Sequence, residues 1–282
     1  MSFPSNGTNH YNAIKNELST KEYLEKYADS IYPCLEKKKY RVESKGGTTY
    51  KADNIIYSEN NIVINISDKQ KKNGISNGSY DYTNTSKPIN KLLNRDSVSV
   101  KQIQSVLGGV KETKKLPKEE RKKLVPSYRI LVSEASNSFL NGISPDELTD
   151  LIKQYLIEPN KEMEMFITDN KMDERYTFPF IKHPVVELIK DGFIPSIKVK
   201  VGKMSGNIIF TKNNQEKSIG LRIRCHTNNG VSALLGLSNS NSNSQFVLKF
   251  QQDNVDKLID TMGVSPIAIW LLCIRKKCNI YG

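Results

Sequence analysis

The stretch KADNIIYSENNIVINISDKQKK, residues 51–72, decides the fold of the first part of this chain. Two apolar runs flank the polar turn formed by Ser58 to Asn61, a pattern that predicts a β-hairpin. Successive side chains of a strand point to opposite faces of the sheet. On the return strand, one face is therefore expected to carry Ile62, Ile64, Ile66 and Asp68, and the other Val63, Asn65, Ser67 and Lys69.

Asp53 opens the first strand of this hairpin and Lys69 closes the second, so we expect their side chains to converge at one end of a sheet. One carboxylate, a backbone carbonyl and a phosphate oxygen can hold Mg²⁺, which keeps several water ligands. A lysine beside such an ion can orient the attacking water or offset the charge that develops on the phosphate. The pair favours a metal-dependent phosphodiester site, and the alternative is an exposed hairpin with a solvated lysine.

The hairpin resembles that of the PD-(D/E)XK nucleases, the superfamily of most restriction endonucleases. Ala52-Asp53 stands where the family has Pro-Asp, and Ser67-Asp68-Lys69 stands where it has (D/E)-X-K. The resemblance covers roughly residues 10–135 and implies an α/β (α+β) fold of the restriction-endonuclease type, in which helices flank a mixed central sheet. It also implies a Mg²⁺ cofactor held by Asp53 and the Asp68 backbone carbonyl, with Ser67 completing the catalytic site and Lys69 assisting the water.

Ser67 departs from the family pattern, in which the second acid is usually Asp or Glu. The missing metal contact is then left to a hydroxyl, a backbone carbonyl or a carboxylate from elsewhere. Ser19 and Glu22 form a capping-box pattern ahead of an amphipathic stretch, which predicts a helix over residues 20–31. In the family this helix often offers a glutamate to the metal, and Glu22 or Glu25 stands in that place; the alternative is a glutamate that only caps the helix.

The composition favours a polyanionic partner. The chain holds 42 Lys+Arg against 30 Asp+Glu, which gives a net charge of +12 and a pI near 9.3, with a mean hydropathy of −0.51. Such a balance attracts nucleic acid, and we expect duplex DNA as the partner. The cysteines form no CxxC pair and the histidines are scattered, which argues against a zinc module. No GxxxxGK[ST] loop is present, so ATP is not expected as a ligand.

The chain shows no sign of export or of a membrane span. Residues 1–17 lack the basic start and the apolar stretch of a secretory signal. The longest apolar run, residues 267–274, is too short to cross a bilayer. We therefore expect a cytoplasmic protein, in a bacterium or in a virus- or phage-infected cell, with no membrane partner.

A loop rich in Gly, Asn and Ser follows the hairpin and carries basic and aromatic side chains suited to DNA. The expected DNA contacts there are Lys71, Lys72, Tyr80 and Tyr82. Beyond the loop, the pattern predicts a helix that opens at Ser99, a basic helix face from Lys111 to Lys123 and a buried strand from Tyr128 to Val132. Helix, hairpin, helix and strand is the order that the resemblance implies for a nuclease core.

The second half is predicted to be rich in β-strands. Alternation over Ile197–Val201 and Ile219–His226, the turn Asn228-Asn229-Gly230 and the run Gln245–Phe250 indicate an antiparallel sheet, and SPDE at residues 144–147 predicts a helix start. Arg and Lys can bind phosphate or guanine, and Asn can pair with adenine. The expected DNA-binding residues are Lys198, Lys200, Arg222, Arg224, His226, Asn228 and Asn229. The alternative is an ordinary sheet with solvated basic side chains.

Together these patterns predict a nuclease core over residues 1–140 and a β-rich recognition region over residues 141–282, or one continuous domain. The predicted protein is a Mg²⁺-dependent, sequence-specific deoxyribonuclease that hydrolyses phosphodiester bonds of duplex DNA, like a type II enzyme of a restriction-modification system. The alternatives are a homing or phage-encoded nuclease, an RNA nuclease, and a non-catalytic DNA- or RNA-binding protein. A palindromic target would favour a homodimer.

Overall fold

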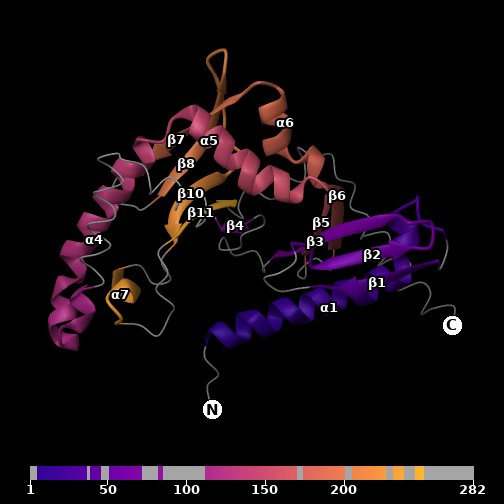
Figure 1. The fold of residues 1–282 in the computed structure, drawn as a ribbon, viewed down its shortest axis with the longest axis horizontal. Coiled ribbons are helices and arrows are strands. Elements are labelled where there is room, and N and C mark those ends of the chain that lie inside the picture. The colour runs from indigo at the N-terminus through magenta and orange to yellow at the C-terminus, as the bar shows by residue number, and fades with distance from the viewer. Residues whose placement is uncertain are drawn as a thin grey trace. The chain divides into compact units, whose positions relative to one another are not determined.

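The computed structural model describes residues 5–36, 39–45, 51–71, 82–84, 112–169, 174–200, 205–226, 231–237 and 245–250. The chain divides into two compact units, each with a β-sheet of its own (Figure 1). Both helices and strands contribute to each unit, so the mixed α/β class predicted from the sequence is confirmed.

The first unit contains one long helix and a five-stranded sheet. Its elements are α1 (Ser5–Ile31), β1 (Tyr40–Ser44), β2 (Asn54–Ser58), β3 (Val63–Lys71), β5 (Met163–Asp169) and β6 (Glu174–Pro179). The strand order is β1-β2-β3-β5-β6. The β3–β5 pair is parallel, and the other neighbouring pairs are antiparallel. The sheet is therefore mixed, with its one parallel junction at the strand that carries Ser67 and Lys69.

The predicted hairpin is confirmed as β2 and β3. Asn54 pairs with Ile66 and Tyr57 pairs with Val63. In the connecting turn, the Ser58 N–H donates to the Ile62 carbonyl at 3.0 Å, and Asn61 has a φ of 62°. Asn tolerates this left-handed conformation better than most residues, so Asn61 is well placed in this turn.

Helix α1 packs on one face of this sheet. Leu24 and Ala28 are fully buried and form a cluster with strand residues that include Val42, Ile56 and Phe166. The alternation predicted for the return strand is confirmed, since Ile62, Ile64 and Ile66 all join this cluster. The predicted helix start is wrong: α1 begins at Ser5, so Ser19 and Glu22 lie inside the helix. A capping-box pattern is short enough to occur by chance within a longer helix.

The second unit contains an antiparallel sheet. Its strands are β4 (Tyr82–Asn84), β7 (Ile194–Val199), β8 (Ser205–Lys212), β9 (Gln215–Lys217), β10 (Leu221–His226) and β11 (Gln245–Phe250). Their order is β4-β11-β10-β8-β7, with β9 paired to β8. The strands predicted from alternation correspond to β7, β10 and β11, and all recorded pairings between these strands are antiparallel.

Helices α4 (Lys118–Asn141), α5 (Pro145–Ile152) and α7 (Val231–Leu234) belong to the second unit. The strand predicted over Tyr128–Val132 is wrong, because these residues lie within α4. The apolar run is too short to separate a buried strand from a helix by periodicity alone, and the buried residues of α4 recur at helical spacing: Val132, Ala135, Ser136, Phe139 and Leu140. The predicted start of α5 is confirmed, since Ser144 and Glu147 form a capping box.

The two units are interleaved along the sequence. Strand β4 precedes α4, yet it pairs with β11 in the second sheet. The boundary predicted between residues 140 and 141 falls at the end of α4, within the second unit. Helix α6 (Pro184–Lys190) follows β6 after one 3₁₀ turn. The helix predicted from Ser99 and the turn predicted at residues 228–230 lie outside the described residues.

Among the described residues, no helix has both the length and the apolar character needed to cross a membrane.

Candidate active site and nucleic-acid interface

Asp53 is held in place by both strands that flank it. Its backbone N–H donates to the Ile66 carbonyl at 2.9 Å, and its carbonyl accepts from the Lys45 N–H at 2.9 Å. Its carboxylate Oδ2 accepts a hydrogen bond from the Asp68 backbone N–H at 2.6 Å. The half-buried carboxylate therefore lies against the Ser67-Asp68 peptide of β3. The two halves of the sequence pattern, Asp53 and Ser67-Asp68, meet at one end of the sheet.

Ser67 and Asp68 occupy opposite faces of β3. Ser67 is 4% exposed and Asp68 is 9% exposed, and β3 is an inner strand between β2 and β5. Asp68 shares its face with Ile66, which packs beneath α1. Ser67 alternates to the other face, next along β3 from Asn65, which pairs with Ile55. The buried Ser67 hydroxyl thus belongs to the face that α1 does not cover.

Lys69 lies two positions beyond Ser67 on β3, where its backbone pairs with Ile167 of β5. The backbone of Lys71 pairs with Asp169 at the end of the same strand. The side chains of these two lysines, and all of Lys72 and Tyr80, lie outside the described residues.

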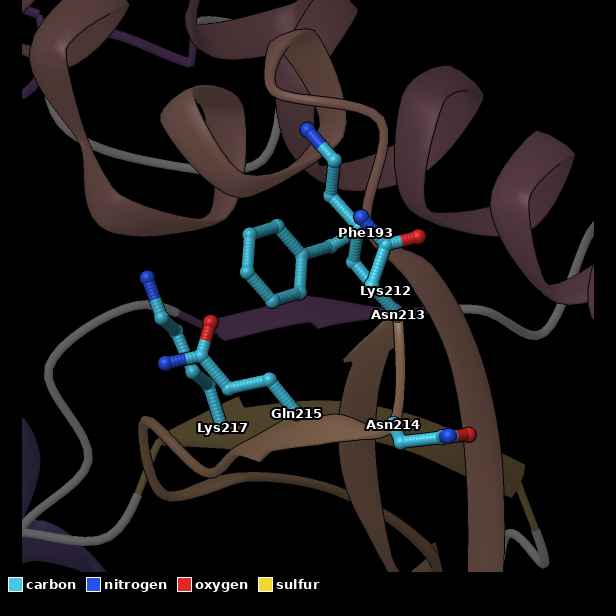
Figure 2. A pocket seen from close by; sticks show the side chains of 6 residues that line it. All are labelled: Phe193, Lys212, Asn213, Asn214, Gln215 and Lys217. Atoms are coloured by element: carbon cyan, nitrogen blue, oxygen red, sulfur yellow. The ribbon is translucent and has the colours of Figure 1, made fainter.

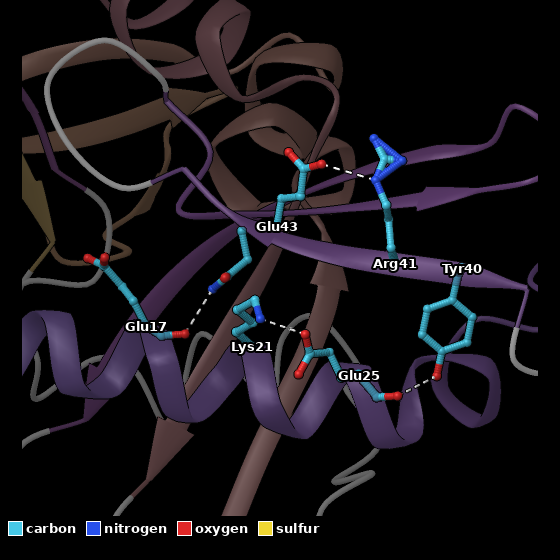
Figure 3. Close-up of polar contacts among 7 residues, drawn as sticks. Glu17, Lys21, Glu25, Tyr40, Arg41 and Glu43 are labelled. Atoms are coloured by element: carbon cyan, nitrogen blue, oxygen red, sulfur yellow. Dashed lines mark hydrogen bonds and ion pairs between the residues drawn. The ribbon is translucent and has the colours of Figure 1, made fainter.

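The metal role expected of Glu22 or Glu25 stays a prediction. Both glutamates are exposed on α1, and the Glu25 carboxylate accepts from Lys21 at 2.6 Å. The Glu25 carbonyl accepts from the Tyr40 hydroxyl at 3.2 Å (Figure 3). Within the described part of the chain, no group of three or more His, Cys, Asp or Glu could hold a metal.

Glu17 was missed by the sequence analysis. Asn54, the residue next to Asp53, donates its side-chain amide to the Glu17 carbonyl at 3.3 Å. This contact ties α1 to the end of β2, and Figure 3 shows Glu17 on the same helix as Glu25. The helix was expected to start only at residue 20, so Glu17 was not predicted to lie beside the sheet.

Glu164 is a half-buried acid of the first sheet. It lies on β5, paired with Ile66 of β3 and Pro179 of β6. Burial raises the pKa of Glu164 to about 7, and the nearby Lys182 opposes this rise. Burial likewise raises the pKa of the Tyr32 phenol, which shares a hydrogen bond of 3.1 Å with Thr177 Oγ1. With a pKa of about 7, the Glu164 carboxyl group is close to half protonated at neutral pH.

Polar and basic residues line up across the second sheet. The strand register places Lys198 beside Asn207, Asn207 beside Arg222, Arg222 beside Lys249, and Lys249 beside Tyr82. We call these five positions the cross-strand row. Cross-strand neighbours lie on one face, and strands are spaced about 4.8 Å apart, so the row spans roughly 19 Å. This register places Lys198 and Arg222 on one face of the sheet.

The described contacts of the predicted DNA-binding residues differ. Lys198 is 58% exposed and binds Glu216 of β9 through both carboxylate oxygens, at 2.7 and 2.9 Å. Lys200 is exposed, and its N–H donates to the Ser205 carbonyl. Arg222 is half-buried. The backbones of Arg224 and His226 pair within β10 and β11, and Asn228 and Asn229 lie outside the described residues.

Part of the basic run from Lys111 to Lys123 serves the fold. The Arg121 guanidinium donates to the Leu235 and Gly236 carbonyls at 2.7 and 3.1 Å, which satisfies carbonyl groups at the end of α7. Lys122 forms an ion pair with Glu119 at 2.8 Å. These side chains are already engaged within the unit, so the run is a weaker candidate for DNA contact than its charge suggests.

The comparisons with known proteins give no family for this chain. No protein-family model and no curated protein matches it. The function of this chain is therefore inferred from the geometry of its own residues.

Proposed function

We propose that this protein is a Mg²⁺-dependent endonuclease that cuts duplex DNA at specific sequences, in the manner of a type II restriction enzyme. The observation that carries the proposal is the 2.6 Å hydrogen bond from the Asp68 N–H to the Asp53 carboxylate. It brings the acid of one strand to the Ser67-Asp68-Lys69 segment of the next. Neither half of the pattern has this meaning alone.

The topology of the first sheet supports the same proposal. A helix, three antiparallel strands and a further strand parallel to β3 are consistent with the restriction-endonuclease type of fold. The parallel strand is β5, which comes later in the chain than the segment predicted for it. The second unit is made of two segments, residues 81–156 between β3 and β5 and residues 188–254 after β6, and its own sheet is available for target recognition.

The donor set at Asp53 fits Mg²⁺ better than a metal that needs several protein ligands. Mg²⁺ keeps several waters and is commonly held by one or two carboxylates together with substrate phosphates. Asp53 would hold the ion with the Asp68 backbone carbonyl, and the Ser67 hydroxyl stands where a second acid is usual. Among the α1 glutamates, Glu17 is the one whose main chain contacts the neighbour of Asp53. When bound, the ion would offset the negative charge that develops on the phosphate.

The chain's own residues would position the Asp53 carboxylate and the attacking water. The Asp68 N–H fixes the Asp53 carboxylate before the substrate arrives, so little reorganisation is needed on binding. Lys69, on the same strand, would orient the attacking water.

The cross-strand row of the second sheet would bind the target. Half or more of the hydrogen bonds in protein–DNA complexes go to phosphate and sugar, and the row offers cations beside the Asn207 amide. Its length of roughly 19 Å corresponds to about five or six nucleotide steps of 3.4 Å. A palindromic target would be read by a homodimer.

The test compares wild type, Asp53→Asn and Asp150→Asn on plasmid and phage DNA, with Mg²⁺ or with EDTA. Asp150 is an exposed acid of α5 and is the matched control. We expect discrete Mg²⁺-dependent fragments from wild type and Asp150→Asn, and a rate at least about a hundredfold lower for Asp53→Asn. Equal cutting by Asp53→Asn and wild type would contradict the proposed site.

A non-catalytic DNA- or RNA-binding protein is the second candidate. The observation in its favour is the serine at position 67, together with the lack of a three-ligand acidic cluster among the described residues. Such a protein would hold DNA equally well in EDTA and leave it intact with Mg²⁺. The same gel, run beside a mobility-shift assay, distinguishes the two.

A further inference from the structure

The β8–β9 hairpin of the second unit is a tightly defined structure that the sequence analysis did not single out. Its two turn residues, Asn213 and Asn214, have φ values of 49° and 63°. Two consecutive residues with positive φ form the turn type that matches the twist of paired strands. Lys212 pairs with Gln215, and Phe210 pairs with Lys217. Both lysines are therefore fixed at the backbone level.

A cleft of about 640 Å³ opens beside this hairpin, lined by Phe193, Lys212, Asn213, Asn214, Gln215 and Lys217. Figure 2 shows the side chains of the two lysines on either side of the Phe193 ring. Lys217 Nζ lies 4.5 Å from the ring centroid and Lys212 Nζ lies 5.8 Å from it. The ring itself is only 6% exposed, and Lys212 also donates to the Asp191 carbonyl. One buried ring thus holds both ammonium groups beside the same cleft.

The cleft is lined by basic and amide side chains, whereas Lys198 on the neighbouring strand β7 is paired with an acid. None of its six lining residues is acidic, and three of them carry side-chain amides. Glu216, which lies between Gln215 and Lys217, binds Lys198 instead. Its register partner is Thr211, which lies between Phe210 and Lys212 on β8, so Glu216 belongs to the opposite face from the two lysines. Glu216 therefore pairs with Lys198 of the cross-strand row and leaves the two cleft lysines to an external anion.

We propose that this cleft binds the phosphodiester backbone of DNA, as a second contact surface distinct from the cross-strand row. Lysine acts as a compact point charge toward phosphate, and amide side chains commonly donate to phosphate oxygens. The volume is larger than one phosphate requires and falls in the range of sites that hold whole ligands. This inference rests on the DNA binding of the proposed function, and it is independent of the catalytic role of Asp53.

The test measures the affinity for a fluorescent DNA duplex by anisotropy, over a series of salt concentrations with Ca²⁺ in place of Mg²⁺. Each phosphate contact contributes about 0.9 to the slope of log K against log salt. We expect the double substitution Lys212→Gln with Lys217→Gln to reduce this slope by roughly 1.8. The variant with arginine at both positions keeps the charge and should keep the slope. Lys26→Gln is the matched control, because Lys26 is an exposed lysine that also lies over an aromatic ring, 5.2 Å from the Tyr27 centroid.

A slope that is the same for the glutamine variant and wild type would overturn the inference. Acetylation of the wild-type chain gives a second result that does not depend on the folding of a variant. Bound duplex should protect Lys212 and Lys217 but not Lys26, and equal acetylation with and without DNA would overturn the inference as well. If wild type binds DNA without cutting it and the slope falls, the cleft stands and the proposed hydrolysis fails. If wild type cuts DNA and the salt slope of the glutamine variant is unchanged, the proposed hydrolysis stands and the DNA-binding role of the cleft fails.

Discussion

The two sheets of this protein place their charged groups in opposite ways. In the first sheet, Asp53, Asp68 and Glu164 are buried or half-buried among paired strands. In the second, Lys198 and Glu216 are both more than half exposed. A side chain held among paired strands is fixed in position, and burial raises the pKa of Glu164, whereas an exposed side chain stays available to a partner. The first arrangement suits chemistry at one point, and the second suits binding along a surface.

The largest difference between the two sheets is expected in DNA affinity, on substitution of Arg222 in the middle of the cross-strand row. Arg222→Gln removes a cation that we expect to contact DNA, and it should weaken duplex binding by roughly ten- to a hundredfold. Cleavage at saturating DNA should stay close to that of wild type, because Asp53 lies in the other sheet. Anisotropy and single-turnover cleavage measure the two quantities separately.

Arg121→Gln is the control for this experiment. Arg121 lies in the same unit, but its guanidinium donates to carbonyls at the end of α7. This variant should lose stability and keep its affinity for DNA. Equal losses of affinity in both variants would show that the cross-strand row has no special role.

The second effect concerns the half-buried acid Glu164. Its pKa is raised to about 7 in the folded protein, so the folded state binds a proton that the unfolded state releases between roughly pH 4.5 and 7. This group therefore contributes stability at low pH, and the contribution is lost as the pH rises through 7. Glu164→Gln keeps the shape without the charge. It should raise the free energy of unfolding by about 1 kcal/mol at pH 8 and by little at pH 5.

Urea denaturation at the two pH values measures this difference, with Glu216→Gln as the exposed control from the second sheet. His183 is fully buried and its pKa is lowered by burial to about 3, so its contribution to stability falls as the pH drops below roughly 6.5. That trend is common to wild type and both variants and cancels in the comparison. A gain from Glu164→Gln that is equal at pH 5 and pH 8 would contradict the buried-acid interpretation.

The smallest effect is expected where the second sheet neutralises one of its own cations. Glu216→Gln releases Lys198 from its ion pair, and exposed pairs are worth little to stability. We expect DNA binding about two- to fivefold tighter, with the salt slope increased by at most about 0.9. Glu119→Gln releases the similarly exposed Lys122 and should leave the affinity unchanged. Weaker binding by Glu216→Gln would show that Lys198 needs its acid to stay in position.

The hairpin that brings Asp53 to the Ser67-Asp68 segment could be predicted from the sequence, because strand parity and a tight turn are local features. The convergence of the Asp53 and Lys69 side chains stays a prediction, because the Lys69 side chain lies outside the described residues. The contribution of α1 was misplaced, because a chance capping-box pattern at Ser19 suggested a late helix start. The pairing of Lys198 with Glu216 could not be foreseen, since it depends on how β7 and β9 lie against β8.

Features that depend only on neighbouring residues could be predicted from the sequence alone: the β2–β3 hairpin, the alternation along β3, the capping box of α5 and the strand β11. Each is set by backbone preferences and side-chain periodicity over a few residues. The tertiary structure decided the rest. Strand β5 joins β3 from a distant part of the chain, β4 joins β11, and Tyr128–Val132 forms part of a helix. These outcomes depend on which distant surfaces bury one another best, and local sequence does not encode that competition.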